Sequence, residues 1–173
     1  MDDESLKNMM EQNHTSAFGW ALYCCNGDQE EAADVLHSVY VQILEKGRLA
    51  FSGKSSFKTW LFSVIRNTSR KRRFQVSHRL RKLQNLVFGL PPAEEKGIEG
   101  RFYENEVRNW ILDLFGRLSK RQRQVLQLAF YHNLTLAEAA VVMGVSVGSA
   151  RTHYERGKVR LRAEMQKVGW NNE

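Results

Sequence analysis

Apolar residues recur at steps of three and four in the first half of the chain, as in helices that bury one face. One such series predicts a helix ending near Gly47, and it comprises Val35, Leu36, Val39, Tyr40, Ile43 and Leu44. A polar turn at residues 52–56 then offers a serine cap for another helix. The residues expected on the core side of that helix are Phe57, Trp60, Leu61, Val64 and Ile65. Period-two alternation, the mark of strands, is scarce, so the chain is predicted to be all-α.

The second half of the chain continues the helical pattern, with about four helices expected. One helix is predicted to end at Ser119, and its apolar face comprises Val107, Trp110, Ile111, Leu114 and Leu118. Ser119 can also cap the next helix, because Gln122 stands three residues later as in a capping box. On that helix the residues expected to face inward are Val125, Leu128 and Ala129.

A break near the midpoint divides the chain into two parts. The two prolines, Pro91 and Pro92, are adjacent, and the residues around them combine Gly, Pro and charge as linkers do. A chain of 173 residues is large enough for two small domains, each with a modest core. The sequence therefore predicts helical domains over residues 1–84 and 104–173, joined by a flexible linker over 85–103.

Residues 134–156 have the pattern of a helix-turn-helix. Thr135 can cap a short helix, and Gly144 can end it in a left-handed conformation that a side chain would penalise. Val145 would fill the gap between the helices, and Ser146 can cap the second one. A short helix, a glycine turn and a second helix are the parts of this DNA-binding motif.

The second helix of this motif separates two kinds of side chain. The side expected to dock on the first helix carries Ala150, Tyr154, Gly157 and Leu161. The opposite side carries hydrogen-bonding and cationic groups, with Arg151 at its edge: Ser149, Thr152, His153 and Arg156. Such groups can reach base edges and phosphates in a major groove. The alternative is an ordinary helical hairpin with a solvated outer face.

Charge is unevenly placed along the chain. There are 26 Lys and Arg residues against 19 Asp and Glu, and no acidic residue interrupts the basic stripe from Arg66 to Lys82. A positive stripe on a mixed background favours a polyanion such as nucleic acid. A solvated basic helix or a disordered linker is the alternative interpretation.

Several other classes of protein and site lack support in the sequence. No stretch approaches the roughly 18 to 20 apolar residues that cross a bilayer, and the acidic start is unlike a secretory signal, so we expect a cytoplasmic protein without membrane insertion. Five His and two adjacent Cys form no CxxC or HExxH arrangement, so we expect no metal and no cofactor. Cys24 and Cys25 are interpreted as small apolar residues, and a redox role for them stays open.

Three ordered segments together resemble the extracytoplasmic-function (ECF) sigma factors, the small sigma factors of bacterial RNA polymerase. Residues 34–44 resemble the region 2 helix that binds the clamp helices of the β′ subunit. Residues 57–68 resemble the segment that recognises and melts the −10 element. Residues 118–126 and the helix-turn-helix resemble region 4, which reads the −35 element.

The resemblance implies a role for individual residues. It assigns polymerase binding to Asp34, Val35, His37, Ser38 and Gln42. It assigns contact with the −10 element and its separated strand to Trp60, Arg66, Asn67, Arg70, Lys71, Arg72 and Arg73. It assigns recognition of the −35 element to Ser149, Arg151, Thr152, His153 and Arg156. The implied partners are the polymerase core with its β′ and β subunits, promoter DNA and an anti-sigma factor.

The sequence thus predicts a non-enzymatic initiation factor that brings core polymerase to promoters and helps to open them. One alternative is a free-standing helix-turn-helix regulator, which would bind duplex DNA tightly without polymerase. A second alternative is a DNA recombinase or invertase. That enzyme needs a nucleophilic Ser or Tyr in an α/β domain, and no strand-rich segment supports one.

Overall fold

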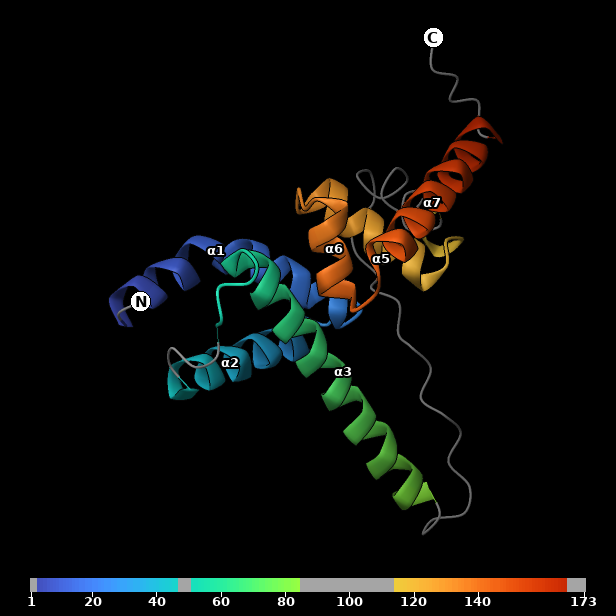
Figure 1. Ribbon diagram of the computed structural model, residues 1–173. Helices are drawn as coiled ribbons and strands as arrows, with labels where there is room; N and C mark the ends of the chain where they lie inside the picture. Colours follow the sequence, from blue (N-terminus) through green and yellow to red (C-terminus); the bar gives the residue numbers. More distant parts are fainter. Residues whose placement is uncertain (1–2, 47–50, 85–113, 168–173) are drawn as a thin grey trace, which may run out of the picture. The chain divides into compact units, whose positions relative to one another are not determined.

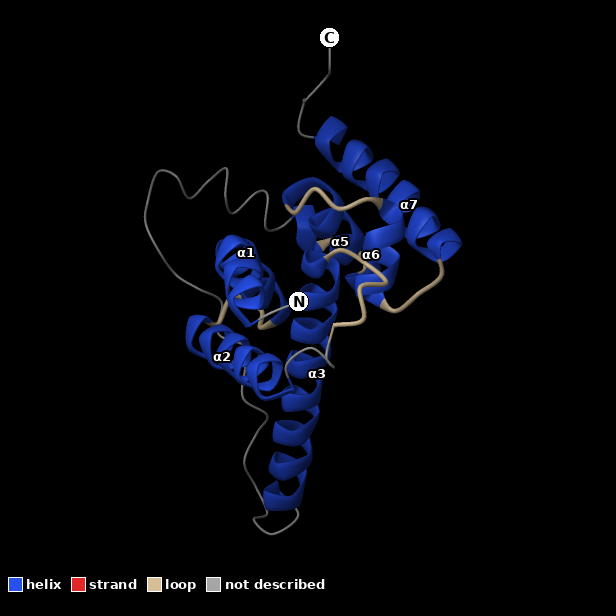
Figure 2. Ribbon diagram, turned by 60° about the vertical axis from the view of Figure 1, so that its left-hand side comes forward, coloured by secondary structure: helices blue, strands red, loops and turns tan. Residues whose placement is uncertain are grey.

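A computed structural model describes residues 3–46, 51–84 and 114–167, and within these ranges every regular element is a helix (Figure 2). The all-α prediction is therefore confirmed. The chain divides into two compact units, residues 1–98 and 99–173. The boundaries predicted at 84/85 and 103/104 stay predictions, because the linker lies outside the described residues.

The first unit consists of three helices, α1 (Asp3–Cys24), α2 (Gln29–Lys46) and α3 (Phe57–Gln84), each of which packs against the other two (Figure 1). The end of α2 and the start of α3 agree with the sequence prediction, whereas α2 begins at Gln29, before two of the acidic residues that were expected to precede it. Helix α3 also continues through the basic stripe, as predicted. No helix was assigned in advance over α1, where polar residues such as Asn13 and Thr15 interrupt the apolar pattern.

Trp20 on α1 occupies the centre of this unit and has no exposed surface. Its indole Nε1 donates a hydrogen bond of 3.0 Å to the carbonyl oxygen of Phe62 on α3. Its ring also stacks on the ring of Phe62, with centroids 5.6 Å apart. The contact therefore fixes both the distance between α1 and α3 and the rotation of α3 about its own axis.

Short side chains begin α2 and α3. Asp28 Oδ1 accepts the backbone N–H of Glu31 at 2.9 Å, and Ser56 Oγ accepts that of Thr59 at 3.2 Å. One part of the predicted apolar face was wrong, because Leu44 is 50% exposed. The buried face of α2 is centred on Val39 and Ile43, and a residue directly after Ile43 is rotated by about 100° away from that centre.

The second unit begins, in its described part, with helical residues 114–116, so most of the helix predicted over 107–118 lies outside the described residues. Ser119 then caps α5 (Lys120–Leu126) through the predicted capping box with Gln122. Helix α5 continues into a π-helical turn, η2 (Gln127–Tyr131), which the sequence pattern did not indicate. Phe130 and Tyr131, the last residues of this turn, are exposed.

The predicted helix-turn-helix is confirmed by α6 (Leu136–Met143) and α7 (Val147–Lys167). Thr135 caps α6, and Gly144 ends it with a left-handed φ of 63°. Ser146 Oγ accepts the backbone N–H of Ser149 at 3.1 Å and so caps α7. The turn between the two helices is therefore defined by local hydrogen bonds that the sequence already indicated.

Helix α7 approaches α5 closely at Gly157, which is buried. A Cβ atom added at this glycine would lie 2.9 Å from Cδ1 of Leu126 and 3.4 Å from Cβ of Gln122. Leu126 is itself only 1% exposed, so its side chain has little room to move away. A hydrogen in place of a side chain at residue 157 is thus what allows the two helices to meet.

We predict that Gly157→Ala destabilises the second unit, whereas Gly148→Ala on the same helix does not. Alanine adds up to about 1 kcal/mol of helix propensity at either position. At residue 157 it also overpacks the core, which costs about 1–3 kcal/mol. Urea unfolding should show the 157 variant to be less stable than the 148 variant by a similar amount, because a Cβ atom at Gly148 would meet only Oγ of Ser146, at a distance of 4.0 Å. Equal stabilities would contradict the packing described for Gly157.

Candidate nucleic-acid interface

Helix α3 has two faces, and they divide the basic stripe of the sequence. The side toward α1 and α2 carries residues that are at most 1% exposed: Leu61, Phe62, Ile65 and Ser69. The opposite side carries exposed residues, which are Asn67, Arg70, Lys71 and Phe74. These four will be called the outer face of α3. The cations that follow one another in sequence therefore do not form one continuous surface.

Arg66 and Arg73 lie on or near the core side of α3. Arg66 is only 7% exposed, and Arg73 Nη2 donates a 2.8 Å hydrogen bond to the carbonyl oxygen of Cys24 at the end of α1. The carbonyls at a helix C-terminus carry partial negative charge, which suits a guanidinium. Arg66 and Arg73 therefore support the packing of the first unit, and the predicted contact of each with DNA stays a prediction.

Arg72 connects two of the predicted surfaces. Its Nη1 lies 3.6 Å from Oδ2 of Asp34 on α2, and both side chains are partly or largely exposed. Asp34 was predicted to contact polymerase, and Arg72 was predicted to contact DNA. An exposed pair of this kind contributes at most about 1 kcal/mol, so either residue can be drawn away by a partner.

The outer face of α3 contains the cations that are available to a ligand. Within the described residues, neither Arg70 nor Lys71 has a carboxylate partner. Asn67 lies one turn before them and is exposed. Trp60 lies two turns before Asn67 and is half-buried, with its ring against those of Phe51 and Phe57 at centroid distances of 5.3 and 5.5 Å. A hydrogen-bonding amide and two cations therefore follow an aromatic ring along one side of the helix.

The predicted polymerase-binding residues do not all share one surface of α2. Asp34, His37 and Gln42 are exposed and Ser38 is half-buried, whereas Val35 has no exposed surface. Val35 packs in the core of the first unit. It can therefore support the helix from within, but in this structure it presents nothing to a partner.

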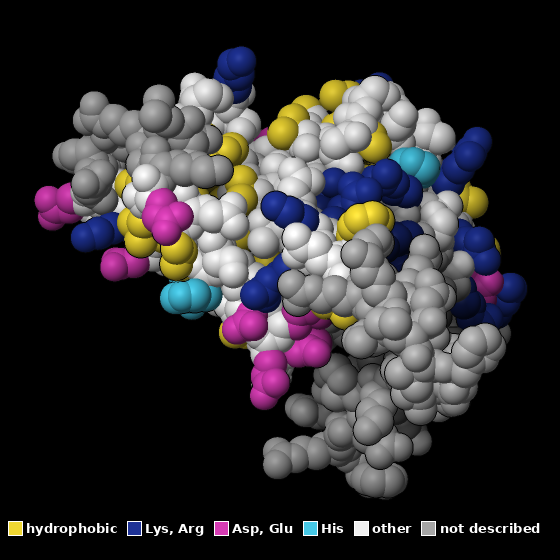
Figure 3. Space-filling model, turned by 90° about the horizontal axis from the view of Figure 1, so that it is seen from below, with side chains coloured by type: hydrophobic (Ala, Val, Ile, Leu, Met, Phe, Trp, Pro, Cys, Tyr) yellow, Lys and Arg dark blue, Asp and Glu magenta, His cyan; other side chains and the backbone are white. Residues whose placement is uncertain are grey.

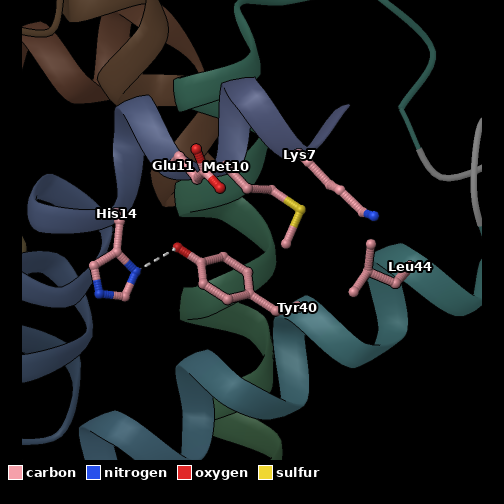
Figure 4. A pocket seen from close by; sticks show the side chains of 6 residues that line it. All are labelled: Lys7, Met10, Glu11, His14, Tyr40 and Leu44. Atoms are coloured by element: carbon pink, nitrogen blue, oxygen red, sulfur yellow. Dashed lines mark hydrogen bonds between the residues drawn. The ribbon is translucent and has the colours of Figure 1, made fainter. Parts of the chain in front are cut away.

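A pocket of about 200 Å³ lies between α1 and α2 (Figure 4). Met10 and Leu44 form its apolar part, and His14 Nδ1 and the hydroxyl of Tyr40 are 3.2 Å apart across it. Burial raises the pKa of Tyr40. The two polar groups pair with each other, and no group of three or more His, Cys, Asp or Glu in the described ranges could hold a metal ion.

In the second unit, α7 carries the predicted −35 residues on its outer side. Ser149, Arg151, Thr152 and Arg156 are exposed, whereas His153 is half-buried. Glu155 pairs with Lys158 at 3.0 Å, and no carboxylate in the described part of the chain pairs with Arg151 or Arg156. This side of α7 is thus polar, cationic and open to a ligand.

Charged side chains are unevenly distributed on the surface. On the face in Figure 3, several Lys and Arg side chains lie together and one group of Asp and Glu side chains lies together, while other acidic side chains stand next to basic ones. None of the described helices is both long enough and apolar enough to cross a membrane.

Both cysteines are free and buried in the first unit, with Cys24 6% and Cys25 4% exposed. Burial, reinforced by the carboxylate of Glu31, raises the pKa of the Cys25 thiol from 9.0 to about 12. A thiolate is the reactive form, so this thiol is inert at neutral pH. The native state also keeps a proton that the unfolded chain releases near pH 9, so this group favours unfolding as the pH rises above 9.

We therefore predict that Cys25 reacts slowly with a thiol reagent such as DTNB at pH 8 in the folded protein. In guanidinium chloride both thiols should react at once, which provides the control in the same chain. The variant Cys24→Ala allows the rate at Cys25 to be read alone. Rapid labelling of the folded variant would contradict the burial of this thiol and reopen a redox role.

Comparisons with known proteins agree with the division into two units. The family model described as sigma-70 region 2 matches residues 9–79, and the model described as sigma-70, region 4 matches residues 108–161. The chain is 25% identical to the ECF RNA polymerase sigma factor SigX of Bacillus subtilis, over 95% of this chain and 85% of SigX. It is 29% identical to the ECF RNA polymerase sigma factor RpoE of Cereibacter sphaeroides, over 79% of this chain and 71% of RpoE.

Two solved structures share the fold. The sigma factor RpoE of Bartonella quintana, solved in complex with the anti-sigma factor NepR, matches with a TM-score of 0.64 at 20% identity, covering 94% of this chain and 98% of that one. CnrH, solved in complex with the cytosolic domain of CnrY, matches with a TM-score of 0.62 at 18% identity, covering 96% and 90%.

Proposed function

The chain belongs to the ECF group of the sigma-70 family, and we propose that it binds core RNA polymerase, directs it to promoters with two recognition elements and helps to open the nearer one. The observation that carries this proposal is the presence of one exposed cationic helix face in each unit. These are the outer face of α3 and the outer side of α7. The proposal assigns no catalytic step and no cofactor to the chain.

The second unit is proposed to read duplex DNA at the −35 element. A helix-turn-helix places its second helix in the major groove, where side chains near the N-terminus reach base edges. Ser149 and Thr152 lie in that part of α7, and Arg151 and Arg156 can reach phosphates or guanine edges. His153 is half-buried, so it is better suited to position the helix than to read a base.

The first unit is proposed to hold the melted −10 element on the outer face of α3. Separated bases can be bound by aromatic rings and amides while cations follow the backbone. Asn67 is suited to hydrogen-bond an unpaired base, and Arg70 and Lys71 are suited to its phosphates. Trp60, two turns before Asn67 on the same side of α3, retains a partly exposed ring. Arg66 is left out of this surface because it is buried.

The outer side of α2 is proposed to bind the polymerase core. Asp34, His37, Ser38 and Gln42 provide carboxylate, imidazole, hydroxyl and amide groups on an exposed helix surface. Binding of both units to one polymerase would also raise the effective concentration of each at its promoter element, provided that the element spacing matches the reach of the linker. We expect this to take place in the cytoplasm, on the nucleoid.

An anti-sigma factor is proposed as a further partner. The RpoE structure that shares this fold was solved with the anti-sigma factor NepR. Such a partner would prevent polymerase binding by covering the exposed surfaces of the two units.

Transcription with purified components tests the main proposal. Core polymerase, the full chain and fragmented genomic DNA would be combined, and the transcript starts would be sequenced. We expect starts that depend on the chain and share two upstream sequence elements. A free-standing regulator would instead bind duplex DNA tightly without core polymerase, and no chain-dependent start would appear.

We predict that Arg151→Ala and Arg156→Ala each weaken binding of the polymerase complex to the −35 duplex. Loss of one phosphate contact should also reduce the slope of log K against log salt by about one. Lys167→Ala is the matched control, because Lys167 lies at the far end of α7 and pairs with Glu164 at 2.7 Å. An unchanged affinity and slope in both arginine variants would exclude this side of α7 as the contact surface.

A further inference from the structure

We propose that Phe74 is a second aromatic platform for unpaired DNA, on which a base of the melted promoter strand stacks. The inference rests on the proposed function and extends it to a residue for which neither the sequence pattern nor the family resemblance implies a role. Phe74 is the last described residue of the outer face of α3. It places an aromatic ring on the far side of the cations from Trp60.

Phe74 lies in line with Trp60 and Asn67 along α3. Trp60, Asn67 and Phe74 follow one another at intervals of seven residues, and seven residues make nearly two turns of a helix. The three side chains therefore follow one line along the helix, separated by steps of about 10.5 Å. Arg70 and Lys71 lie between the last two. An aromatic ring thus stands at each end of a polar and cationic stretch.

The side chain of Phe74 is also unusually exposed to solvent. The side chain of Phe74 is 72% exposed, although a phenyl ring on a helix that packs in a three-helix unit is usually turned toward the core. The core side of α3 is already filled by Phe62 and Ile65, which have no exposed surface. The exposed part of the Phe74 ring is therefore accessible to a ligand.

The charge around Phe74 indicates the kind of ligand that this face would bind. Arg70 and Lys71 lie on the same face as Phe74, and neither has a carboxylate partner among the described residues, so a ligand that covers Phe74 also meets positive charge. A single strand of DNA offers both phosphates for the cations and flat π faces for the ring. In a duplex the base faces are already stacked on each other, so Phe74 can gain this contact only where the strands are separated.

The test uses the full chain bound to core polymerase and a promoter mapped by the transcription experiment. The probes are a fork DNA with an unpaired −10 strand and the matching closed duplex. Phe74→Leu keeps an apolar side chain but removes the ring, and Phe74→Trp restores a ring. Val76→Ala is the matched control, because Val76 is 53% exposed on the same helix but is rotated by about 200° from Phe74.

Base stacking on an aromatic side chain corresponds to about 5-fold to 150-fold in affinity. We expect Phe74→Leu to weaken fork binding by about 10-fold and to lower permanganate reactivity of thymines in the opened promoter. Phe74→Trp should bind the fork within about 2-fold of the parent chain. Duplex affinity and polymerase affinity should not change in either variant.

Three results would overturn the proposal. One is fork binding by Phe74→Leu that equals that of the parent chain or of Val76→Ala. Another is an equal loss on fork and duplex, and the third is weaker polymerase binding, which would make Phe74 a protein contact. Failure of the proposed function is recognised separately, because the parent chain itself would then produce no polymerase-dependent starts.

Discussion

The packing of Trp20 against Phe62 is the constraint on which the first unit depends. The indole donates to a main-chain carbonyl of α3 while its ring stacks on the neighbouring side chain, so α3 cannot rotate without losing both contacts. This rotation decides which members of the basic stripe face solvent. It turns Arg66 toward the core and leaves Asn67, Arg70 and Lys71 outside. The chemistry of the surface is thus determined from the interior.

The second unit obtains the same result by a different route. Here the close approach at Gly157 brings α7 down onto α5, and the buried Ala150 leaves room for α6. Because small residues occupy the inner side of α7, that side packs against α5 and α6, and the long cationic side chains lie on the opposite side. Glu164 also pairs with Arg117 at 2.8 Å and with Lys167 at 2.7 Å. The hydrogen bond from Lys167, with help from Arg117, lowers the pKa of Glu164.

Much of the fold was predictable because its signals are local. Capping by Ser119, Thr135 and Ser146 and the left-handed Gly144 depend on residues within one turn, and all four were confirmed. Burial was harder to predict, since it depends on contacts between helices. Val35 and Arg66 were assigned to binding surfaces from their place in a motif, yet both are buried. The π-helical turn η2 also escaped prediction, because no residue pattern distinguishes it from an ordinary helix.

Thr152 shows how an internal hydrogen bond can restrict what a recognition helix reads. Its hydroxyl donates to the carbonyl oxygen of Gly148 at 3.0 Å, one turn earlier on α7. The hydroxyl proton is thereby used, and only oxygen lone pairs remain for an outside partner. In a major groove the matching donors are the amino groups of adenine and cytosine, and the threonine methyl can lie against that of thymine. Thr152 would therefore disfavour guanine, whose major-groove edge offers only acceptors.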